Sequence, residues 1–574
     1  MLRPGLMLRA GGCAALLAIL TLGPGLRAED APVPAAAPVA AAAPVAVVEP
    51  LAVQIDRLIA AKLPDFDKLA APVSGDFEFL RRIYLDLTGS IPTSKQAREF
   101  LADATPDKRE KLINQLLASP EFARQLARVL DVMLMQRLPG QHVPVADFKA
   151  YLYQACLENR PWNQMVTEIL SADGIDPQTR PASRFYLDRG GEVNLITRDI
   201  GRVFMGVNLE CAQCHNHPHV EDWKQSHYYG ISAFLVRSSL FNEGGKQVFQ
   251  EEAVGEVKFE SVFELRDKIS KGPRSSLPRM FEDALVEEPK FDFGQEYARV
   301  PAKNVRPVPH YSRRAQLADS IVAPTNRQFK RNIANRLWAT VMGRGLVHPL
   351  EYDHRENLAS HPELLDLLAE NIAARNYDPR GFLKDLLLTK TYQRSGLRTP
   401  EQQATPAPAE ESFAVAILRP MMAEQFCWSI MQATGIAEIY RVNLGNNLSE
   451  AKLYEQLAGV EQTFVGVFGG EPGKPPKDFE TSIEQTLYLS NDAMIQSWLG
   501  QSGTNLCQRL VSLPPSDFKP ITEELYLSCL TRLPTDEEVQ EVTAYLADRA
   551  DTRPVAYQEL IWALITSAEF RFNH

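Results

Sequence analysis

The stretch "CAQCHNHPHVEDW", which runs from Cys211 to Trp223, places two cysteines and three histidines within nine residues. Cys211, Cys214 and His215 form the pattern C-x-x-C-H, which is the attachment signature of c-type haem. Two thiols separated by two residues can add to the two vinyl groups of one porphyrin, and the histidine that follows can then bind the iron. The spacing therefore favours a covalently bound haem with His215 as its proximal ligand.

The second axial ligand of such a haem is not evident from the spacing. A small soluble cytochrome c supplies a Met well downstream of its motif, yet no Met closely follows this one. His219, His227 and Met205 are candidates, whereas His217 lies too close in sequence to reach the opposite haem face. A five-coordinate iron is the other option, and it would favour catalysis or ligand binding over simple electron transfer.

Two other interpretations of the cluster stay open. Cys211 and Cys214, with two of the nearby histidines, would supply the four N and S ligands of a tetrahedral zinc site. These histidines are His215, His217, His219 and His227. A closed site would be structural, and an open position would permit hydrolytic chemistry. Alternatively, the two cysteines form a disulfide in an oxidising compartment and the histidines face solvent.

Residues 1–28 have the composition of a secretory signal peptide. Arg3 and Arg9 precede a short apolar run, and small residues lead to an expected cleavage after Ala28. The apolar run is too short for a stable membrane span, and no internal run suggests one. The net charge of −11 becomes more negative once the arginines of this segment are removed, which disfavours nucleic-acid binding. We therefore expect a periplasmic or secreted protein.

The chain has 574 residues, enough for two or three domains, and its apolar spacing is mainly helical. Residues 29–50 form an Ala/Pro-rich tether, 51–240 a helical domain with the Cys-His cluster, and 312–574 a second helical domain. Residues 241–311 are richer in proline and partly alternate apolar and polar side chains, which predicts a connecting segment with short strands. The expected fold class is mainly α, with two helical domains joined by this mixed segment.

A duplicated helical hairpin unit is expected at the two ends of the folded chain. "YLDLTGSIPTSKQAREFLAD" (84–103) resembles "YLSCLTRLPTDEEVQEVTAYLAD" (526–548), and "LLASPEF" (116–122) resembles "LITSAEF" (564–570). Thr93 with Gln96, and Thr535 with Glu538, each predict a capping box at a helix start. We interpret the similarity of these segments as one duplicated packing element whose copies could dock together. Convergence on a common helical hairpin is the alternative.

Several longer motifs resemble one known family. They include "RRIYLDLTGSIPT", "CAQCHNHP", "YYGISAFL", "NRLWATVMGRGLVHP" and "SAEFRFNH", which follow the family's order over nearly all of residues 50–574. The chain is therefore similar to the planctomycete secreted cytochrome-like proteins, which pair an N-terminal cytochrome-like domain with a C-terminal domain of unknown function. The resemblance implies an exported protein, and the family is named cytochrome-like for the C-x-x-C-H motif, which is Cys211, Cys214 and His215 here; it implies no established biochemical role. Many relatives carry a further cytochrome c domain where this chain has only the Ala/Pro tether. This departure from the family pattern removes an obvious electron-transfer partner in the same chain and argues against a redox role.

Two classes of function follow from these observations. The first is an exported haem protein that transfers electrons to a redox partner protein or oxidises an extracellular substrate. The second is a structural or partner-binding protein in which the Cys-His cluster holds zinc or a disulfide. A metal hydrolase with an open zinc position is a weaker third option.

Overall fold

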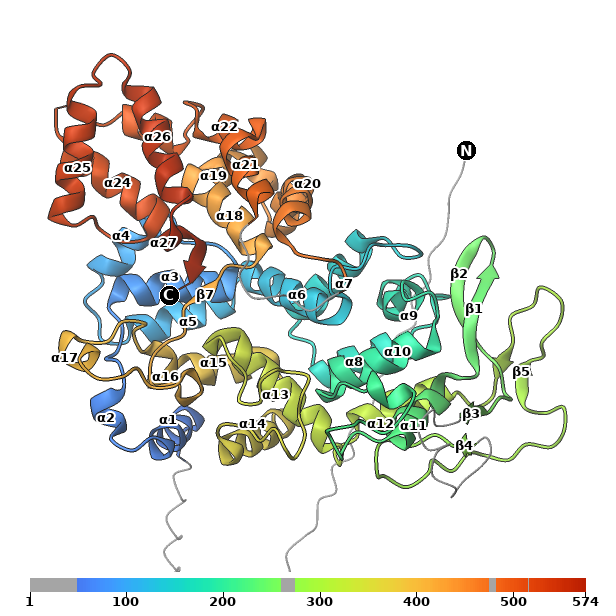
Figure 1. Cartoon of the computed structure of the whole chain (residues 1–574). Coiled ribbons are helices and arrows are strands. Elements are labelled where there is room, and N and C mark those ends of the chain that lie inside the picture. The colour runs from blue at the N-terminus through green and yellow to red at the C-terminus, as the bar shows by residue number, and fades with distance from the viewer. Residues whose placement is uncertain (1–48, 260–273, 474–481, 515, 574) are drawn as a thin grey trace, which may run out of the picture. The chain divides into compact units, whose positions relative to one another are not determined.

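The computed structural model describes residues 49–259, 274–473, 482–514 and 516–573. The chain from Glu49 onward forms one unit. This unit is mainly helical, which confirms the fold class expected from the sequence (Figure 1). The expected signal peptide and nearly all of the tether lie outside the described residues. None of the described helices is both long and apolar enough to cross a membrane.

Helices make up the first part of the unit, up to the connecting segment. Their bounds are α1 (Leu51–Lys62), α2 (Phe66–Leu69), α3 (Asp76–Thr88), α4 (Ser94–Ala102), α5 (Lys108–Leu117), α6 (Pro120–Met135), α7 (Val145–Leu157), α8 (Trp162–Ser171), α9 (Arg184–Leu187), α10 (Val193–Ile200) and α11 (Gln225–Leu235). Shorter turns lie between them: the 3-10 turns η1 (Arg180–Ser183) and η3 (Cys211–Gln213), and the π-helical turn η2 (Gly201–Met205).

The connecting segment contains short antiparallel strand pairs, as its alternating pattern predicts. β1 (Ser238–Glu243) pairs with β2 (Lys246–Glu251), β3 (Val257–Phe259) with β4 (Arg274–Ser276), and β5 (Tyr297–Arg299) with β6 (Val308–Pro309). Each pair is a separate two-stranded sheet among the described residues. The segment therefore adds local hairpins to a helical protein.

The remaining chain is again helical. Its elements are α12 (Arg313–Val322), α13 (Arg327–Met342), α14 (Pro362–Ala374), α15 (Pro379–Leu387), α16 (Lys390–Gln393), α17 (Pro400–Gln403), η5 (Glu410–Ser412), β7 (Arg419–Pro420), α18 (Ala423–Thr434), α19 (Ile436–Leu444), η6 (Gly445–Asn447), α20 (Glu450–Phe468), α21 (Ile483–Asn491), α22 (Ala493–Leu499), α23 (Leu506–Val511), α24 (Phe518–Leu530), α25 (Asp536–Ala547), α26 (Arg553–Ile565), α27 (Ala568–Arg571) and β8 (Phe572–Asn573). β7 pairs with β8, which joins the last residues to the middle of the chain.

The buried apolar residues form two main cores. Nearly all of the first core lies between Leu51 and Ala414, so helices on both sides of the connecting segment share it. The second core is built mainly from residues 426–570. Packing thus places α12–α17 with the N-terminal helices, while the division of the chain into domains at 241–311 stays a prediction.

The two copies of the predicted hairpin unit share their local geometry. Thr93 and Thr535 both form the expected capping boxes, at the starts of α4 and α25. The preceding helices, α3 and α24, both end in a left-handed residue, Gly89 with φ 70° and Thr531 with φ 62°. The matching turn residues of the two copies therefore adopt the same local backbone geometry.

The two copies also dock against each other. Leu85 of α3 lies in the second core, and the equivalent Leu527 of α24 lies in the first. Arg81 is 1% exposed and donates hydrogen bonds to the carbonyls of Cys529 and Phe570, at 3.2 and 2.9 Å. Figure 1 shows α24 and α27 next to α3 and α4. Each copy therefore contributes an equivalent leucine to the core of the other.

We expect His361, the residue before α14, to make the stability of the first core depend on pH. It is 4% exposed and packs on Phe413, and burial, together with the nearby Lys62, lowers its pKa to about 4 from 6.5. Protonation of His361 therefore favours the unfolded chain. The folded state has its full stability while His361 is neutral in both states, above pH 6.5, and it loses stability as the pH falls towards 4. The expected loss is up to about 3 kcal/mol. Urea-unfolding midpoints between pH 7 and 4 should fall less steeply in His361→Gln, and equal slopes would contradict the prediction.

Candidate functional site

The Cys-His cluster lies in a loop between η2 and α11, which we define as the Cys-His loop, residues 206–224. The loop begins at Gly206, whose φ of 68° lies in the left-handed region that favours glycine. The preceding η2 is a π-helical turn, a feature that is frequent at functional sites. The sequence motif is thus carried by irregular backbone between two helical elements.

Cys211, Cys214 and His215 lie on one tight turn of this loop. The backbone N–H groups of Cys214 and His215 both donate to the Cys211 carbonyl, at 3.2 and 3.3 Å. Residues three and four apart on such a turn are neighbours on one side of it. Both thiols are exposed, and neither forms a disulfide. The turn therefore brings together the three residues that the motif predicts to act together.

His215 is oriented by the backbone of its own loop. Its Nδ1 lies 2.6 Å from the Asn216 carbonyl oxygen, which can accept a hydrogen bond only if Nδ1 carries the proton. This tautomer places the lone pair on Nε2, the nitrogen that would bind a haem iron or a zinc ion. The arrangement is compatible with the predicted ligand role of His215.

Residues of α11 bind the loop on both sides of Cys214, at the Gln213 carbonyl and at the Asn216 side chain. The Tyr229 hydroxyl donates to the Gln213 carbonyl at 2.9 Å, and the Gln225 side-chain amide donates to the same oxygen at 3.4 Å. The Gln225 backbone N–H donates to the Asn216 side chain at 2.9 Å. Burial raises the pKa of Tyr229, and the nearby Cys214 adds to the rise, so the hydroxyl stays a donor.

His217 forms hydrogen bonds within the Cys-His loop. Its Nδ1 accepts the backbone N–H groups of His219 and Val220, at 3.2 and 3.0 Å, and its own N–H donates to the Trp223 carbonyl at 2.9 Å. Burial and the neighbouring histidines lower the pKa of His217, which favours the neutral ring that can accept. Because Nδ1 accepts, the proton is on Nε2, and neither nitrogen offers a metal ion its lone pair in this arrangement.

His227 interacts with the connecting segment. It is buried on α11, its Nε2 lies 3.0 Å from the Glu282 carboxylate, and its ring lies edge-on to Phe281 with 5.5 Å between centroids. Burial lowers the pKa of His227 and outweighs the opposite effect of Glu282. The contacts of His227 therefore serve the packing of α11.

The described residues contain no preformed zinc site. Within residues 49–573, apart from the gaps given above, no group of three or more His, Cys, Asp or Glu side chains is placed to hold a metal ion. The ligand roles assigned to His215, His217, His219 and His227 stay predictions.

Sequence reasoning missed His354, which packs on the Cys-His loop from beyond the connecting segment. The Trp223 ring contacts the rings of His217, Tyr352 and His354, with centroid distances of 5.1, 5.4 and 5.1 Å. Trp223 is 2% exposed. Local patterns could not predict this contact because the two segments meet only through the fold.

The residues of the loop suit a c-type haem by their chemistry. Two exposed thiols on one turn, followed directly by a histidine, are the groups that thioether attachment and iron binding require. The buried indole N–H of Trp223 has no hydrogen-bond acceptor among the described residues. Such a group costs about 1 to 3 kcal/mol.

Met205 does not suit the role of second axial ligand. Its side chain is fully buried, and its sulfur accepts a hydrogen bond from the Asn326 side chain at 3.7 Å. The methionine therefore belongs to the first core.

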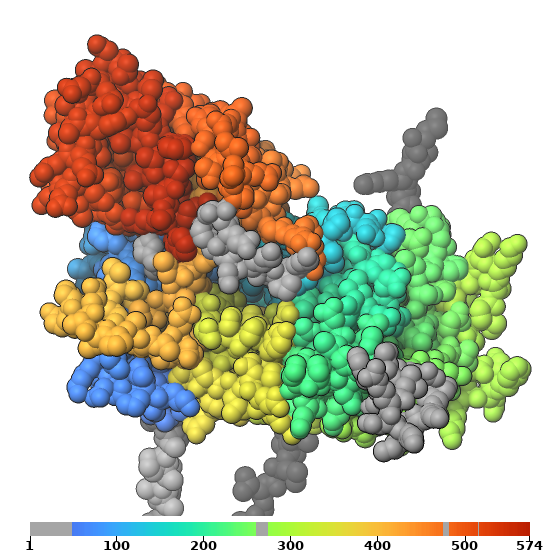
Figure 2. Space-filling model, in the orientation of Figure 1, coloured from blue at the N-terminus to red at the C-terminus, as the bar shows by residue number. Residues whose placement is uncertain are grey.

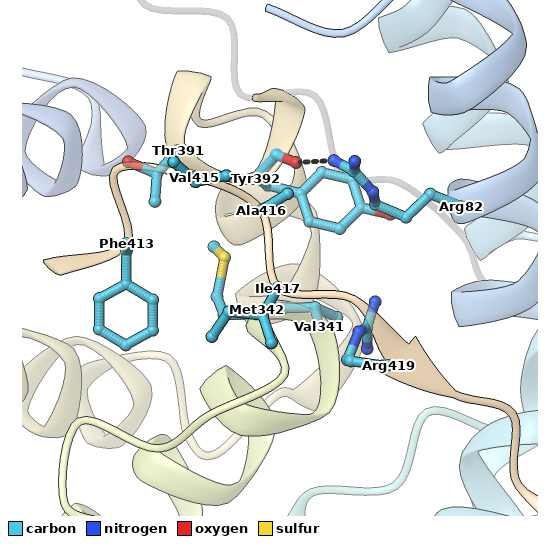
Figure 3. Close-up of a pocket in the computed structure, with 10 residues that line it drawn as sticks. All are labelled: Arg82, Val341, Met342, Thr391, Tyr392, Phe413, Val415, Ala416, Ile417 and Arg419. Carbon is cyan, nitrogen blue, oxygen red and sulfur yellow. Dashed lines mark hydrogen bonds between the residues drawn. The ribbon is translucent and has the colours of Figure 1, made fainter. Parts of the chain in front are cut away.

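A small pocket lies elsewhere in the unit (Figure 3). Its lining includes Arg82, Tyr392 and Arg419, and its volume is about 20 Å3, room for about one water molecule. None of its lining residues among those described belongs to the Cys-His loop. Its polar side chains join α3 to later segments, so we assign the pocket to packing.

Two family models match the chain. Residues 54–239 match PSCyt2: Protein of unknown function (DUF1549), and residues 313–455 match PSD1: Protein of unknown function (DUF1553). Both models describe planctomycete-type domains of unknown function, and the chain is similar to each over the matched residues. The Cys-His loop lies in the PSCyt2 region, and Tyr352 and His354 lie in the PSD1 region. Both descriptions give the function as unknown, and a cytochrome-like domain is not shown. Searches of curated proteins and of solved structures found no match.

Proposed function

We propose that the protein is an exported haem protein that holds one c-type haem through Cys211 and Cys214, with His215 as proximal ligand. The observation that carries the proposal is the tight turn on which two exposed, unbridged thiols precede a histidine whose Nδ1 lies 2.6 Å from the Asn216 carbonyl oxygen. Its function is electron transfer to a redox partner protein or oxidation of an extracellular substrate.

Attachment requires the S–H of each cysteine to add across one vinyl C=C bond of the porphyrin. A C–S bond and a C–H bond form, the C=C bond becomes a single bond, and no group leaves. Cys211 and Cys214 supply the two sulfurs, and their exposure gives a maturation enzyme access to both.

The residues around the motif orient it. The Asn216 carbonyl fixes the ring of His215, and Tyr229 and Gln225 hold the Gln213 carbonyl between the two cysteines. When bound, a haem supplies one-electron redox chemistry or ligand binding at its iron. The exposed position of the motif allows a partner protein to approach it.

We expect the full chain, purified from a periplasm competent for cytochrome maturation, to show the added mass of one haem. A Soret band should survive acid–acetone extraction. The double variant C211A/C214A should lose both signals, because no thioether can form. Cys156→Ala is the matched control: this cysteine is buried outside the motif, and the variant should keep the haem.

A colourless wild-type protein of unmodified mass would overturn the haem proposal. Metal analysis of the same sample then separates the other interpretations. Bound zinc, with stability that falls on adding a chelator, would indicate a metal site. A mass two hydrogen atoms below that of the reduced protein would indicate a disulfide between Cys211 and Cys214.

A further inference from the structure

Two side chains of α13, in the PSD1 region, bind the turn that leads into the Cys-His loop. Asn332 donates to the Val203 carbonyl and Arg336 donates to the Arg202 carbonyl, both at 2.7 Å. Arg336 also donates to the Asn332 side-chain oxygen at 2.9 Å, which links the two donors. The last carbonyls of a helix lack partners within it, and here another region supplies donors to them.

The turn of residues 352–356 continues this contact at the start of the loop. The Asp353 backbone N–H donates to the Gly206 carbonyl at 3.0 Å, and Tyr352 forms an antiparallel bridge with Val207. A Cβ at Gly206 would lie 3.0 Å from the Asn332 side-chain oxygen, so this close approach itself favours glycine.

The same turn binds the end of the loop. The Asp222 carboxylate accepts the Arg355 backbone N–H at 2.7 Å and pairs with the Arg355 guanidinium at 2.6 Å. His354 and Tyr352 pack on the neighbouring Trp223. The PSD1 region therefore contacts the Cys-His loop at both of its ends, and Figure 2 shows the yellow surface of this region next to the green surface of the first.

We propose that the PSD1 region positions the Cys-His loop, with His354 and Arg355 as positioning residues. They act through Trp223 and Asp222. The Trp223 carbonyl accepts the N–H of His217, which lies two residues after His215. The inference goes beyond haem binding, because the loop is held in this way whatever Cys211 and Cys214 bind. It also gives the two matched regions a common task.

Hydrogen exchange in the full-length protein without cofactor tests this inference. The backbone amides of His217, His219 and Val220 donate hydrogen bonds within the loop. In His354→Ala, the peptide that contains them should exchange about tenfold faster, which corresponds to about 1.4 kcal/mol. His354→Phe keeps a ring against Trp223 and should restore most of the protection.

Arg355→Ala gives a second test that does not endanger the fold, because this side chain is 72% exposed. The same peptide should exchange roughly threefold faster, since the ion pair of the guanidinium with Asp222 is lost while the hydrogen bond from the backbone N–H of residue 355 remains. The matched control is Arg327→Ala, which removes an exposed ion pair with Asp366 in the same region and should leave the loop unchanged.

The buried cysteines report on folding in the same samples. Cys156, Cys427, Cys507 and Cys529 are buried and should stay unmodified by an alkylating reagent, whereas Cys211 and Cys214 react. Exchange at the wild-type rate in both loop variants, with the buried cysteines still unmodified, would overturn the inference. Failure of the haem proposal appears separately, as the unmodified mass of the wild-type protein.

Discussion

Glu461→Gln is expected to lower the free energy of unfolding by about 3 to 5 kcal/mol, because it breaks a buried ion pair. The side chain of Glu461 is 1% exposed, and its carboxylate accepts from Arg128 at 2.6 Å, the Trp428 indole at 2.7 Å and the Tyr454 hydroxyl at 3.0 Å. Lys149 lies 3.4 Å from its second oxygen. A neutral amide leaves the Arg128 charge in the interior without a counter-ion, where removal from water is costly.

Urea unfolding followed by circular dichroism measures this loss. The control is Glu438→Gln, whose carboxylate pairs with Arg441 at the surface; its change should stay within about 1 kcal/mol. A Glu461→Gln midpoint as high as that of the control would contradict the prediction.

The same carboxylate should make the free energy of unfolding of the wild-type protein depend on pH. Burial alone would raise the pKa of Glu461, but Arg128 and Lys149 outweigh it and lower the pKa from 4.5 to about 2. The stabilisation is therefore full above pH 4.5 and is lost as the pH falls towards 2. The stability of the Glu461→Gln variant should therefore fall less than that of the wild type between pH 4.5 and 2.

Asp86→Asn is expected to cost about 3 to 5 kcal/mol as well, because Asp86 is the counter-ion of a buried network. Its carboxylate, on α3, accepts from Arg419 at 2.9 Å, the Tyr392 hydroxyl at 2.9 Å and the Asn573 side chain at 2.7 Å. These partners come from three later segments, and Tyr392 and Arg419 are drawn in Figure 3. An asparagine would direct N–H donors at groups that are themselves donors.

The Asp86 variant should also release the C-terminus, because β7 and β8 pair through Arg419 and Asn573. Carboxypeptidase digestion followed by mass spectrometry should remove terminal residues faster than in the wild type, and the urea midpoint should fall. Asp107→Asn removes an exposed pair with Lys111 and serves as the control. Equal digestion rates in the two variants would argue against this role of Asp86.

Features set by neighbouring residues were predictable from the sequence. The capping boxes of Thr93 and Thr535 depend on side chains three residues apart, and both formed as expected. The C-x-x-C-H motif closes within a single turn, so the proximity of Cys211 and His215 also follows from spacing. The helical class follows in the same way from apolar periodicity, which each segment carries by itself.

Features set by distant segments were not predictable. His354 meets Trp223 only because the turn of residues 352–356 packs on the loop, and nothing near either residue signals the contact. Asp86 and Glu461 look like ordinary helical acids in sequence, although each anchors a buried network. The composition change at 241–311 correctly indicated strands, but the border between the two cores depends on how α12–α17 pack, which composition does not encode.

Leu85 packs in the second core and Leu527 in the first, and this arrangement has a consequence for folding during synthesis. α3 is complete early in synthesis, yet Arg81 has to wait for the carbonyls of Cys529 and Phe570, which lie 448 and 489 residues later. Contacts between such distant residues form slowly, and an apolar surface that waits for its partner is prone to aggregation. A chaperone that keeps the nascent chain unfolded until the last helix leaves the ribosome should therefore raise the yield of native protein.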